Sequence, residues 1–480
     1  MPASLNALAS LPEIVVLAAA ALILVVDLFI PDDRRHFTYW LTQLALLVAF
    51  AVTLTSFRLE AVTAFNGLVI DDMLADFLRL ACIIAVSLVL FYSRSYLTAR
   101  GMFRGEVFVL MLFALLGMQV MITGNNFLTL YLGLELLSLS LYALVASWRD
   151  HTASTEAAMK YFVLGALASG MLLYGMSMIY GTTGSLDLTT VARAIGAHQA
   201  SPALLLLGIV FVVAGLAFKL AVVPFHMWVP DVYDGAPTPV TVLVGTAPKI
   251  AAFAMALRLL SSALQGSAFD WQGMLIVLSV LSMVLGNVIA IAQTNLKRLL
   301  GYSTISHIGF LLLGLVAGTP AGFAAALFYA ISYALMATAA FGVILALARA
   351  GFECEEIDDF KGLNQRSPWM AFLMMLAMFS LAGVPPLYGF FAKYLVLQAA
   401  IDAHMLWLAI VGVVFAIIGL YYYLRVVKVM YFDKAEEGVL TKLQPDATLR
   451  VVLSLNALVL VALGIYWGPL LGWCKQAFVG

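Results

Sequence analysis

Residues 203–231 read ALLLLGIVFVVAGLAFKLAVVPFHMWVPD, an apolar run that contains one lysine and is then interrupted by a proline. Proline has no backbone N–H to donate and clashes with the preceding turn, so a helix through this run must break near Pro224. A lysine at membrane depth is costly, and broken helices at that depth usually line a polar cavity. The stretch therefore predicts a helical membrane protein with a polar route through its interior.

The composition of the whole chain agrees with a membrane protein. Of its 480 residues 64% are hydrophobic and 11% charged, and the mean hydropathy is +1.04; this balance excludes a water-soluble globular domain. A net charge of -1 gives no electrostatic footprint for nucleic acid. The three cysteines stand far apart without a CxxC pair, which argues against an iron–sulfur cluster, a structural zinc or a disulfide framework and favours small apolar fillers: Cys82, Cys354 and Cys474.

Apolar stretches of about 20 residues, the length that crosses a bilayer, recur along the chain. We predict an all-α polytopic protein with fourteen spans, at 13–30, 37–57, 74–97, 105–123, 126–147, 157–180, 203–223, 239–260, 271–293, 299–317, 322–349, 369–399, 405–431 and 449–470. No basic segment precedes the first span, so it is interpreted as a retained helix and not a signal peptide. The longest polar connections are too short for a soluble domain: 181–202, 350–368 and 432–448.

A second span is interrupted in the same way. Residues 380–395 read SLAGVPPLYGFFAKYL, with two consecutive prolines in the middle of span 12. Because proline cannot donate to the carbonyl four residues before it, three carbonyls are predicted to lose their helical partners: those of Leu220, Leu381 and Ala382.

The two interruptions suggest an internal repeat. Spans 4–8 (residues 105–260) and spans 9–13 (residues 271–431) form two units of five, and the broken span is the fourth of each. Since five is odd, the second unit starts on the opposite face and is inverted, as in many transporters. Residues 1–104 and 449–480 supply the three preceding helices and the last helix.

Basic residues predict the orientation of the spans. With the N-terminus outside, four basic residues stay outside: Arg58, Arg193, Arg258 and Lys475. Seventeen fall on the cytoplasmic side: Arg34, Arg35, Arg94, Arg100, Arg104, Arg149, Lys160, Lys297, Arg298, Arg349, Lys361, Arg366, Arg425, Lys428, Lys434, Lys442 and Arg450. This asymmetry follows the positive-inside rule, so both termini are expected to face outward.

Four charged residues fall well inside predicted spans. Glu135 is near the centre of span 5, Lys219 lies shortly before the break of span 7, and Lys393 is in the second half of span 12. Lys249 follows a proline in span 8 whose missing N–H leaves the Val244 carbonyl as a possible partner. Each such charge costs about 2.5 to 3.5 kcal/mol at the bilayer centre, so four of them call for a compensating role.

Two interpretations of these charges stand side by side. They are structural ion pairs or long side chains that reach an interface, or they carry protons. Three lysines outnumber the single carboxylate, which favours proton transfer. Lysine suits this role because it gives up its proton when desolvated and regains it near a carboxylate, whereas arginine keeps its proton at any accessible pH.

Several polar residues have both a supporting and a structural interpretation. His226, beside the break of span 7, and His307, in GYSTISHIGF, relay protons or serve as packing residues. Lys160 opens span 6 and feeds the pathway or snorkels to the surface. Asp231 and Asp234 form an entry site or simply cap a turn. At the outer edge of span 3 we expect an interfacial cluster with Asp76 and Arg79 paired at helical spacing: Asp71, Asp72, Asp76 and Arg79.

Three stretches together resemble a known family. They are AFKLAVVPFHMWVPDVYDGAPTPVTVLVGTAPKIAAF (217–253), NLKRLLGYSTISHIGF (295–310) and SLAGVPPLYGFFAKYLVL (380–397). They resemble the antiporter-like membrane subunits of respiratory complex I, the bacterial proton-translocating NADH:quinone oxidoreductase, over nearly the whole chain.

Three features distinguish the chain from two branches of that family. Subunits L and M and the sodium/proton antiporter subunits usually have a second histidine where this chain reads DVYDGAPTP. The long C-terminal extension of subunit L is missing, and Lys393 stands where subunit M typically has glutamate. The chain therefore resembles the third antiporter-like subunit.

The resemblance implies a proton pathway with Glu135 and Lys219 as a coupled pair, Lys249 as central relay and Lys393 next to the outward exit. Residues at the His307 and Lys160 positions have supporting roles in the family. The resemblance also implies that this subunit binds no cofactor, because NADH, FMN, iron–sulfur clusters and quinone are bound by other subunits. The implied neighbours are subunit M and the small membrane subunits A, J and K, in the bacterial inner membrane.

Three other functions remain open. A stand-alone or Mrp-type cation/proton antiporter would need an acidic sodium site, whereas Glu135 is the one clear midplane carboxylate. A transporter for an organic solute would need a larger polar pocket. A non-conducting scaffold of the complex predicts that all four buried charges can be neutralised without loss of pumping.

Overall fold

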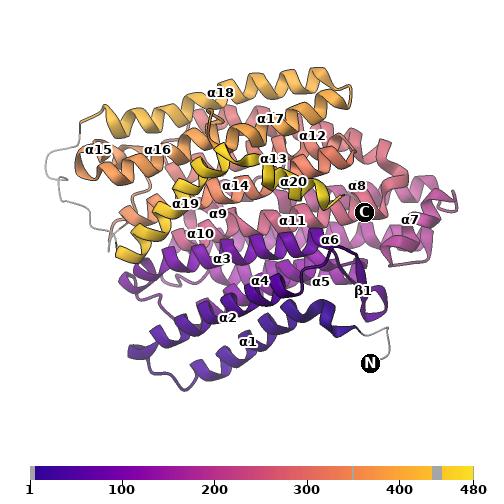
Figure 1. The fold of residues 1–480 in the computed structure, drawn as a ribbon, viewed down its shortest axis with the longest axis horizontal. Coiled ribbons are helices and arrows are strands. Elements are labelled where there is room, and N and C mark those ends of the chain that lie inside the picture. The colour runs from indigo at the N-terminus through magenta and orange to yellow at the C-terminus, as the bar shows by residue number, and fades with distance from the viewer. Residues whose placement is uncertain (1–5, 349–350, 435–445, 479–480) are drawn as a thin grey trace.

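The computed structural model describes residues 6–348, 351–434 and 446–478, which form a bundle of long helices running in nearly the same direction (Figure 1). Two basic residues of the predicted asymmetry, Arg349 and Lys442, lie outside the described residues, as do the last two residues of the C-terminal segment. Helix α1 begins and helix α20 ends toward the same end of the bundle (Figure 1), as an even number of spans requires.

Three helices and a hairpin precede the first unit: α1 (Leu11–Asp27), α2 (His36–Thr55), β1 (Val62–Ala64), β2 (Val69–Asp71) and α3 (Met73–Ala99). The two strands are antiparallel, with Val62 opposite Asp71.

The first unit contains α4 (Gly105–Thr123), α5 (Phe127–Val145), α6 (Thr152–Thr183), α7 (Leu188–Gly196), α8 (Pro202–Leu220), α9 (Trp228–Gly235), α10 (Thr238–Gly245) and α11 (Ala247–Leu257), followed by a π-helical turn, Arg258–Ala263.

The second unit and the C-terminal segment contain α12 (Ala268–Ile291), α13 (Leu296–Val316), α14 (Pro320–Leu347), α15 (Leu363–Arg366), α16 (Pro368–Ala382), α17 (Tyr388–Asp402), α18 (Leu406–Tyr431), α19 (Ala447–Ile465) and α20 (Trp467–Gln476). The described residues also contain five short 3₁₀ turns: Ala7–Ser10, Asp32–Arg34, Phe65–Gly67, Gln265–Ser267 and Ile357–Phe360.

The predicted spans are confirmed in the described residues. Thirteen helices there are long and apolar enough to cross a membrane, and the shorter apolar helix α16 forms the remaining span together with α17. The interruptions in spans 7 and 12 are present, and span 8 is also broken, at Thr246, which has φ −122° and ψ −91°. The sequence analysis missed α7, because its nine residues are too few and too polar for a span.

The two units share a matching pair of loop contacts, which supports the predicted repeat. An isolated bridge joins Asn126 to Asp187 in the first unit, and another joins Asn295 to Glu356 in the second. In each, the asparagine side chain caps the second helix of its unit. The flanking backbone bonds also correspond: Phe127 N–H to Leu186 O and Leu188 N–H to Asn125 O in one, Leu296 N–H to Glu355 O and Ile357 N–H to Thr294 O in the other.

The two bridges lie at opposite ends of α3, which agrees with an inverted arrangement. The loop of the first bridge bonds the segment before α3, through Asn125 N–H and Leu68 O at 3.0 Å. The loop before the second bridge bonds the segment after α3, through Arg100 Nε and Glu353 Oε1 at 2.6 Å.

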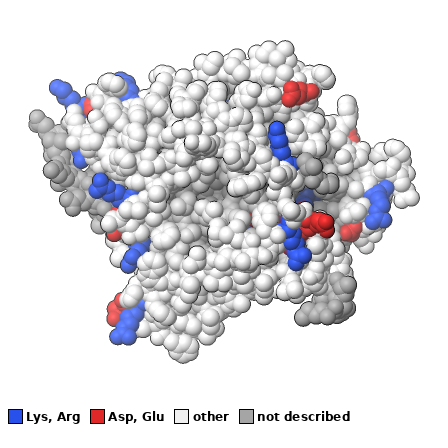
Figure 2. Space-filling model, in the orientation of Figure 1, with Lys and Arg blue, Asp and Glu red and all other residues white. Residues whose placement is uncertain are grey.

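The charged side chains on the face shown in Figure 2 gather toward the two ends of the molecule and leave a wide middle band without charge. A band of this kind matches the hydrocarbon core of a bilayer. Helices α10, α11, α13 and α14 are almost completely buried within the bundle, whereas α1 and α18 lie at opposite edges of it (Figure 1). The interior helices are therefore shielded from lipid by other helices of the chain.

Three of the four residues in the cluster predicted at the outer edge of span 3 are buried within the protein: Asp71, Asp76 and Arg79. Arg79 is fully buried and bonds three carboxylates: Glu13 at 2.8 Å, Asp71 at 2.5 Å and Asp76 at 2.9 Å. The predicted pair of Asp76 and Arg79 exists, but spacing along one helix gave no sign of Glu13 on α1 or of the hairpin residue Asp71. The network fastens α1 and the hairpin to α3.

The neighbouring pair of Asp72 and Arg258 leads to a pH-dependent prediction. Arg258 donates to both Asp72 oxygens, at 2.7 and 2.8 Å. Burial alone raises the pKa of Asp72, but the Arg258 charge and the hydrogen bonds outweigh it and hold that pKa below its usual range. The variant Asp72→Asn retains a side chain that caps α3 but loses the charge, so we expect it to lose about 1.5 to 3 kcal/mol of stability at pH 7.

Because the folded pKa of Asp72 is lowered, this contribution is complete above the ordinary aspartate pKa of about 3.9 and disappears as the pH falls through the lower folded value. Thermal denaturation in detergent between pH 3 and 7 checks this. The difference between wild type and Asp72→Asn should shrink toward pH 3, and a constant difference at all pH values would contradict the ion pair.

Candidate functional site

Lys219 lies at the C-terminal end of the broken helix α8. The helix ends because Ala221 takes the left-handed conformation (φ 72°) and Pro224 follows. The Lys219 side chain is buried, and its Nζ donates a hydrogen bond to the Ser138 hydroxyl at 2.9 Å. The lysine is thus held against α5 at the break.

Glu135, the predicted partner of Lys219, is not bonded to it directly. Glu135 precedes Ser138 by almost one turn on α5, so the two side chains share a face of that helix. Within the described residues no ion pair joins Glu135 to Lys219, and the buried Glu135 Oε1 has no hydrogen-bond partner. The Ser138 hydroxyl itself donates to the Leu134 carbonyl at 2.7 Å, so it holds Lys219 on the face of α5 that carries Glu135 and leaves the Glu135 Oε1 able to accept a hydrogen bond.

Lys249 is buried on α11 and bonds the end of α8. Its Nζ donates to the carbonyl of Lys219 at 3.2 Å and lies 4.7 Å from the centre of the Trp228 ring. The Trp228 indole N–H donates to the preceding carbonyl, that of Phe218. The sequence suggested the Val244 carbonyl as the partner of Lys249. The ammonium bonds the Lys219 carbonyl instead, because a break at Thr246 that was not predicted separates α10 from α11.

Lys393 lies on α17, and its side chain reaches the end of α16 as that of Lys249 reaches the end of α8. Helix α16 ends at a left-handed glycine, Gly383 (φ 86°), and the Lys393 Nζ donates to the Ala382 carbonyl at 2.9 Å. The prediction that this carbonyl loses its helical partner is confirmed, and the lysine replaces the missing N–H. The same ammonium lies 5.2 Å from the centre of the Phe310 ring on α13.

His307 is buried on α13, one turn before Phe310, between two tyrosine hydroxyls. Its Nδ1 lies 2.7 Å from the Tyr329 hydroxyl and its Nε2 lies 3.0 Å from the Tyr423 hydroxyl. A neutral imidazole donates through one nitrogen and accepts through the other, so His307 can pass a proton between these hydroxyls.

Further hydroxyl and amide groups extend this network, and the sequence analysis did not identify them. Tyr423 also contacts the Ser303 hydroxyl, Tyr422 donates to Asn287 at 3.0 Å, and Asn287 donates to Ser306 at 2.8 Å. In the sequence, this network is indicated by polar residues that recur at helical spacing around His307 in span 10. Their tyrosine partners come from spans 11 and 13, which only the tertiary fold brings together.

Lys160 lies in a charged surface network and not in the interior. Its Nζ is 2.8 Å from both Glu156 and Asp231, and Arg298 bonds Asp231 at 3.1 Å. Burial tends to raise the pKa of Asp231, but hydrogen bonds from Lys160 and Arg298 hold it below its usual range. Burial raises the pKa of Asp234, which lies 3.5 Å from Arg298.

The remaining residues to be placed are His226, the three cysteines and Lys297. His226 is half-buried in the segment between α8 and α9, and its Nδ1 has no hydrogen-bond partner in the described part of the chain. The three cysteines are buried and form no disulfide within the described part of the chain, as expected of apolar fillers: Cys82, Cys354 and Cys474. Lys297, predicted only as a basic residue of the cytoplasmic side, is a further buried charge: it bonds Glu355 at 2.7 Å and the carbonyls of Asp234 and Ala236.

Two units with interrupted helices, and lysines bonded to the freed carbonyls, define a membrane protein of the antiporter-like class. Residues 124–419 match the NADH:quinone oxidoreductase/Mrp antiporter transmembrane (TM) family. The chain is 54% identical over 475 residues to NADH-quinone oxidoreductase subunit N of Laribacter hongkongensis, covering 99% of this chain and 98% of that protein. It is 55% identical over 480 residues to subunit N of Thiobacillus denitrificans, covering 99% of each.

Among solved structures, a chain of respiratory complex I from Thermus thermophilus with bound aureothin superposes with a TM-score of 0.83 at 31% identity, covering 96% of this chain and 99% of that one. The chain belongs to the NADH:quinone oxidoreductase/Mrp antiporter family and, within it, to the subunit N group. The resemblance seen in the sequence is thereby confirmed, including its separation from subunits L and M.

Proposed function

We propose that this chain is a proton-translocating membrane subunit of an NADH:quinone oxidoreductase and that its buried lysines carry the protons. The observation that carries the proposal is that Lys249 and Lys393 each bond a carbonyl at the C-terminal end of an interrupted helix. That end of a helix bears a partial negative charge, which stabilises an ammonium group inside the membrane. Each break thus supplies a site for one proton.

Each ammonium group also has N–H bonds left for exchange. A protonated lysine has three donors, and within the described residues each of the three lysines has one hydrogen-bond acceptor: Ser138 for Lys219, the Lys219 carbonyl for Lys249, and the Ala382 carbonyl for Lys393. The other N–H bonds can donate to water. A proton can therefore leave or arrive without breaking the contact that positions the side chain.

Two contacts support an order of transfer. Lys249 bonds the backbone of Lys219, so a proton on either lysine repels one on the other in this low-dielectric interior. Glu135 Oε1 has no hydrogen-bond partner among the described residues. While Glu135 is ionised, its negative charge stabilises a proton on Lys219, and this stabilisation ends when Glu135 is protonated. From Lys249 the proton passes through water and the His307 hydroxyl network to Lys393, and then to the outside.

The proposal extends to the assembly. The N- and C-termini face the periplasm, with subunit M on one side and the small membrane subunits A, J and K on the other. NADH, FMN, the iron–sulfur clusters and quinone belong to other subunits, and quinone reduction there shifts the charge near Glu135. The basic residues predicted on the cytoplasmic side support this orientation.

The variant Lys393→Gln tests the proposed function, because glutamine retains an N–H donor but carries no exchangeable charge. NADH-driven proton uptake into inverted membrane vesicles should fall by about a hundredfold, the lower part of the range for losing a proton-transfer group. Assembly of the complex is checked on native gels. Pumping at the wild-type rate in a fully assembled complex would overturn the proposal and favour a scaffold.

A further inference from the structure

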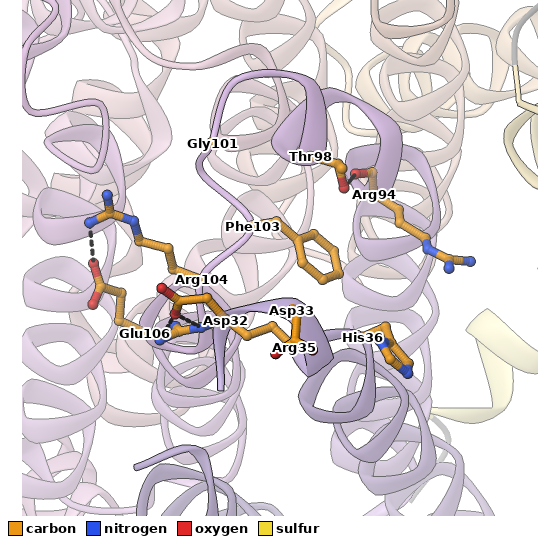
Figure 3. A pocket seen from close by; sticks show the side chains of 10 residues that line it. All are labelled: Asp32, Asp33, Arg35, His36, Arg94, Thr98, Gly101, Phe103, Arg104 and Glu106. Atoms are coloured by element: carbon orange, nitrogen blue, oxygen red, sulfur yellow. Dashed lines mark hydrogen bonds and ion pairs between the residues drawn. The ribbon is translucent and has the colours of Figure 1, made fainter. Parts of the chain in front are cut away.

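A cavity of about 740 Å³ opens at the end of the bundle where α1 joins α2 and α3 joins α4 (Figure 3). Charged side chains line it, among them Arg35, Arg94, Arg104 and Glu106. Because the membrane-length helices α2, α3 and α4 begin or end here, the cavity lies at the boundary between lipid and water.

Arg94 differs from the other arginines of this cavity. Arg35 pairs with Asp32 at 2.8 Å and Arg104 lies 3.9 Å from Glu106, whereas no carboxylate among the described residues pairs with Arg94. Its side chain extends away from both pairs (Figure 3). The Arg94 guanidinium instead lies 5.5 Å from the Tyr39 ring centre and 5.9 Å from that of Trp40. A weakly hydrated guanidinium held by two rings is suited to bind a phosphate group.

An apolar groove of about 470 Å³ begins one turn further along the same two helices. Trp40, Leu44 and Leu47 line it from α2, and Ile84 and Phe91 line it from α3. Its two polar side chains satisfy each other, because the Ser87 hydroxyl donates to Gln43 Oε1 at 3.0 Å. Apart from the Trp40 indole, the groove therefore offers a guest mainly apolar contact.

The groove continues deeper along the bundle. A further cavity of about 270 Å³ shares Phe50 and Ile84 with it and extends to Trp473 on α20. An arginine at the membrane boundary is thus followed by an apolar channel that runs along the bilayer. A peptide in this channel would leave its backbone N–H and C=O groups unsatisfied, whereas an acyl chain has no such groups.

We propose that the face between α2 and α3 is a binding site for one membrane phospholipid. Its phosphate bonds Arg94 in the charged cavity, and one acyl chain lies along Trp40, Leu47 and Ile84 toward α20. The negative surface of the cytoplasmic leaflet would supply such a lipid next to the cavity. This site is separate from the buried lysines, so it does not depend on the proposed proton pathway.

Photo-cross-linking in the intact complex tests the site. The complex is reconstituted in nanodiscs that contain phosphatidylglycerol with a diazirine on one acyl chain, illuminated, and digested for mass spectrometry. Labels are expected to concentrate on residues 40–50 and 84–91. The variant Arg94→Gln should lower this labelling about tenfold, the effect of losing one hydrogen bond to a charged group.

Controls separate a site from general lipid contact. Lys428→Gln, at an exposed lysine on α18 outside the cavity, should leave labelling unchanged, whereas Ile84→Trp should block it by filling the groove. Unlabelled phosphatidylglycerol should compete and diacylglycerol with the same chains should not. Labelling spread evenly over exposed helices such as α18, competition by diacylglycerol, or cross-links to another membrane subunit would each overturn the proposal.

Discussion

Replacing Lys219 by alanine is expected to abolish proton pumping while the complex stays assembled. Lys219 joins two parts of the proposed pathway, because its side chain bonds Ser138 and its carbonyl binds Lys249. The variant Lys219→Ala removes the proton carrier between Glu135 and Lys249. We expect NADH-driven pumping and quinone reductase activity to fall together by about two orders of magnitude or more. Both are measured in membrane vesicles at equal complex content.

The variant Lys219→Arg separates proton transfer from a structural need for positive charge. Arginine preserves the charge and several donors but does not release a proton at any accessible pH. We therefore expect it to be nearly as inactive as the alanine variant. A scaffold predicts the opposite, since a retained charge would satisfy a structural role. Lys428→Ala, at a lysine that is 67% exposed, serves as the matched control and should pump normally.

The positions of the buried lysines could be predicted from sequence because the signals are local. A charge inside an apolar run and a proline near it identify Lys219 and Lys393 without knowledge of the fold. The prediction that proline frees the Ala382 carbonyl was correct, and Lys393 occupies it. Hydropathy likewise located the spans, because membrane length is a property of a continuous segment.

The partners of these residues could not be predicted, because they depend on contacts between distant segments. The break at Thr246 directs Lys249 to the Lys219 carbonyl, and although Pro248 signals a break nearby, it does not show which carbonyl the lysine then reaches. Ser138, an ordinary residue of an apolar span, is the side chain that Lys219 bonds in place of the predicted Glu135. The tyrosines that bond His307 come from two other helices, α14 and α18, and looked like core aromatics in the sequence.

The partners of Arg79 also come from distant segments and could not all be predicted from sequence. Removing Arg79 is expected to give the largest loss of stability in the chain. Its guanidinium is the shared partner of Glu13, Asp71 and Asp76, all of them buried. The variant Arg79→Ala leaves these carboxylates without that cation, and removing one partner of a buried ion pair typically costs about 3 to 5 kcal/mol. We expect a lower thermal midpoint of the purified complex and early loss of α1 to protease.

A charge-balanced variant shows whether the loss comes from uncompensated charge. Arg79→Met combined with Glu13→Gln and Asp76→Asn leaves Asp71 with Arg58, which lies 3.2 Å away, and should recover much of the stability because no buried charge remains unpaired. Arg104→Ala, at a side chain that is 53% exposed, should change stability by less than about 1 kcal/mol. If Arg79→Ala melted like wild type, these carboxylates would have to be hydrated or protonated in the complex. Because the network lies apart from the lysines, surviving Arg79→Ala complexes should still pump, which separates the fastening of α1 from proton transfer.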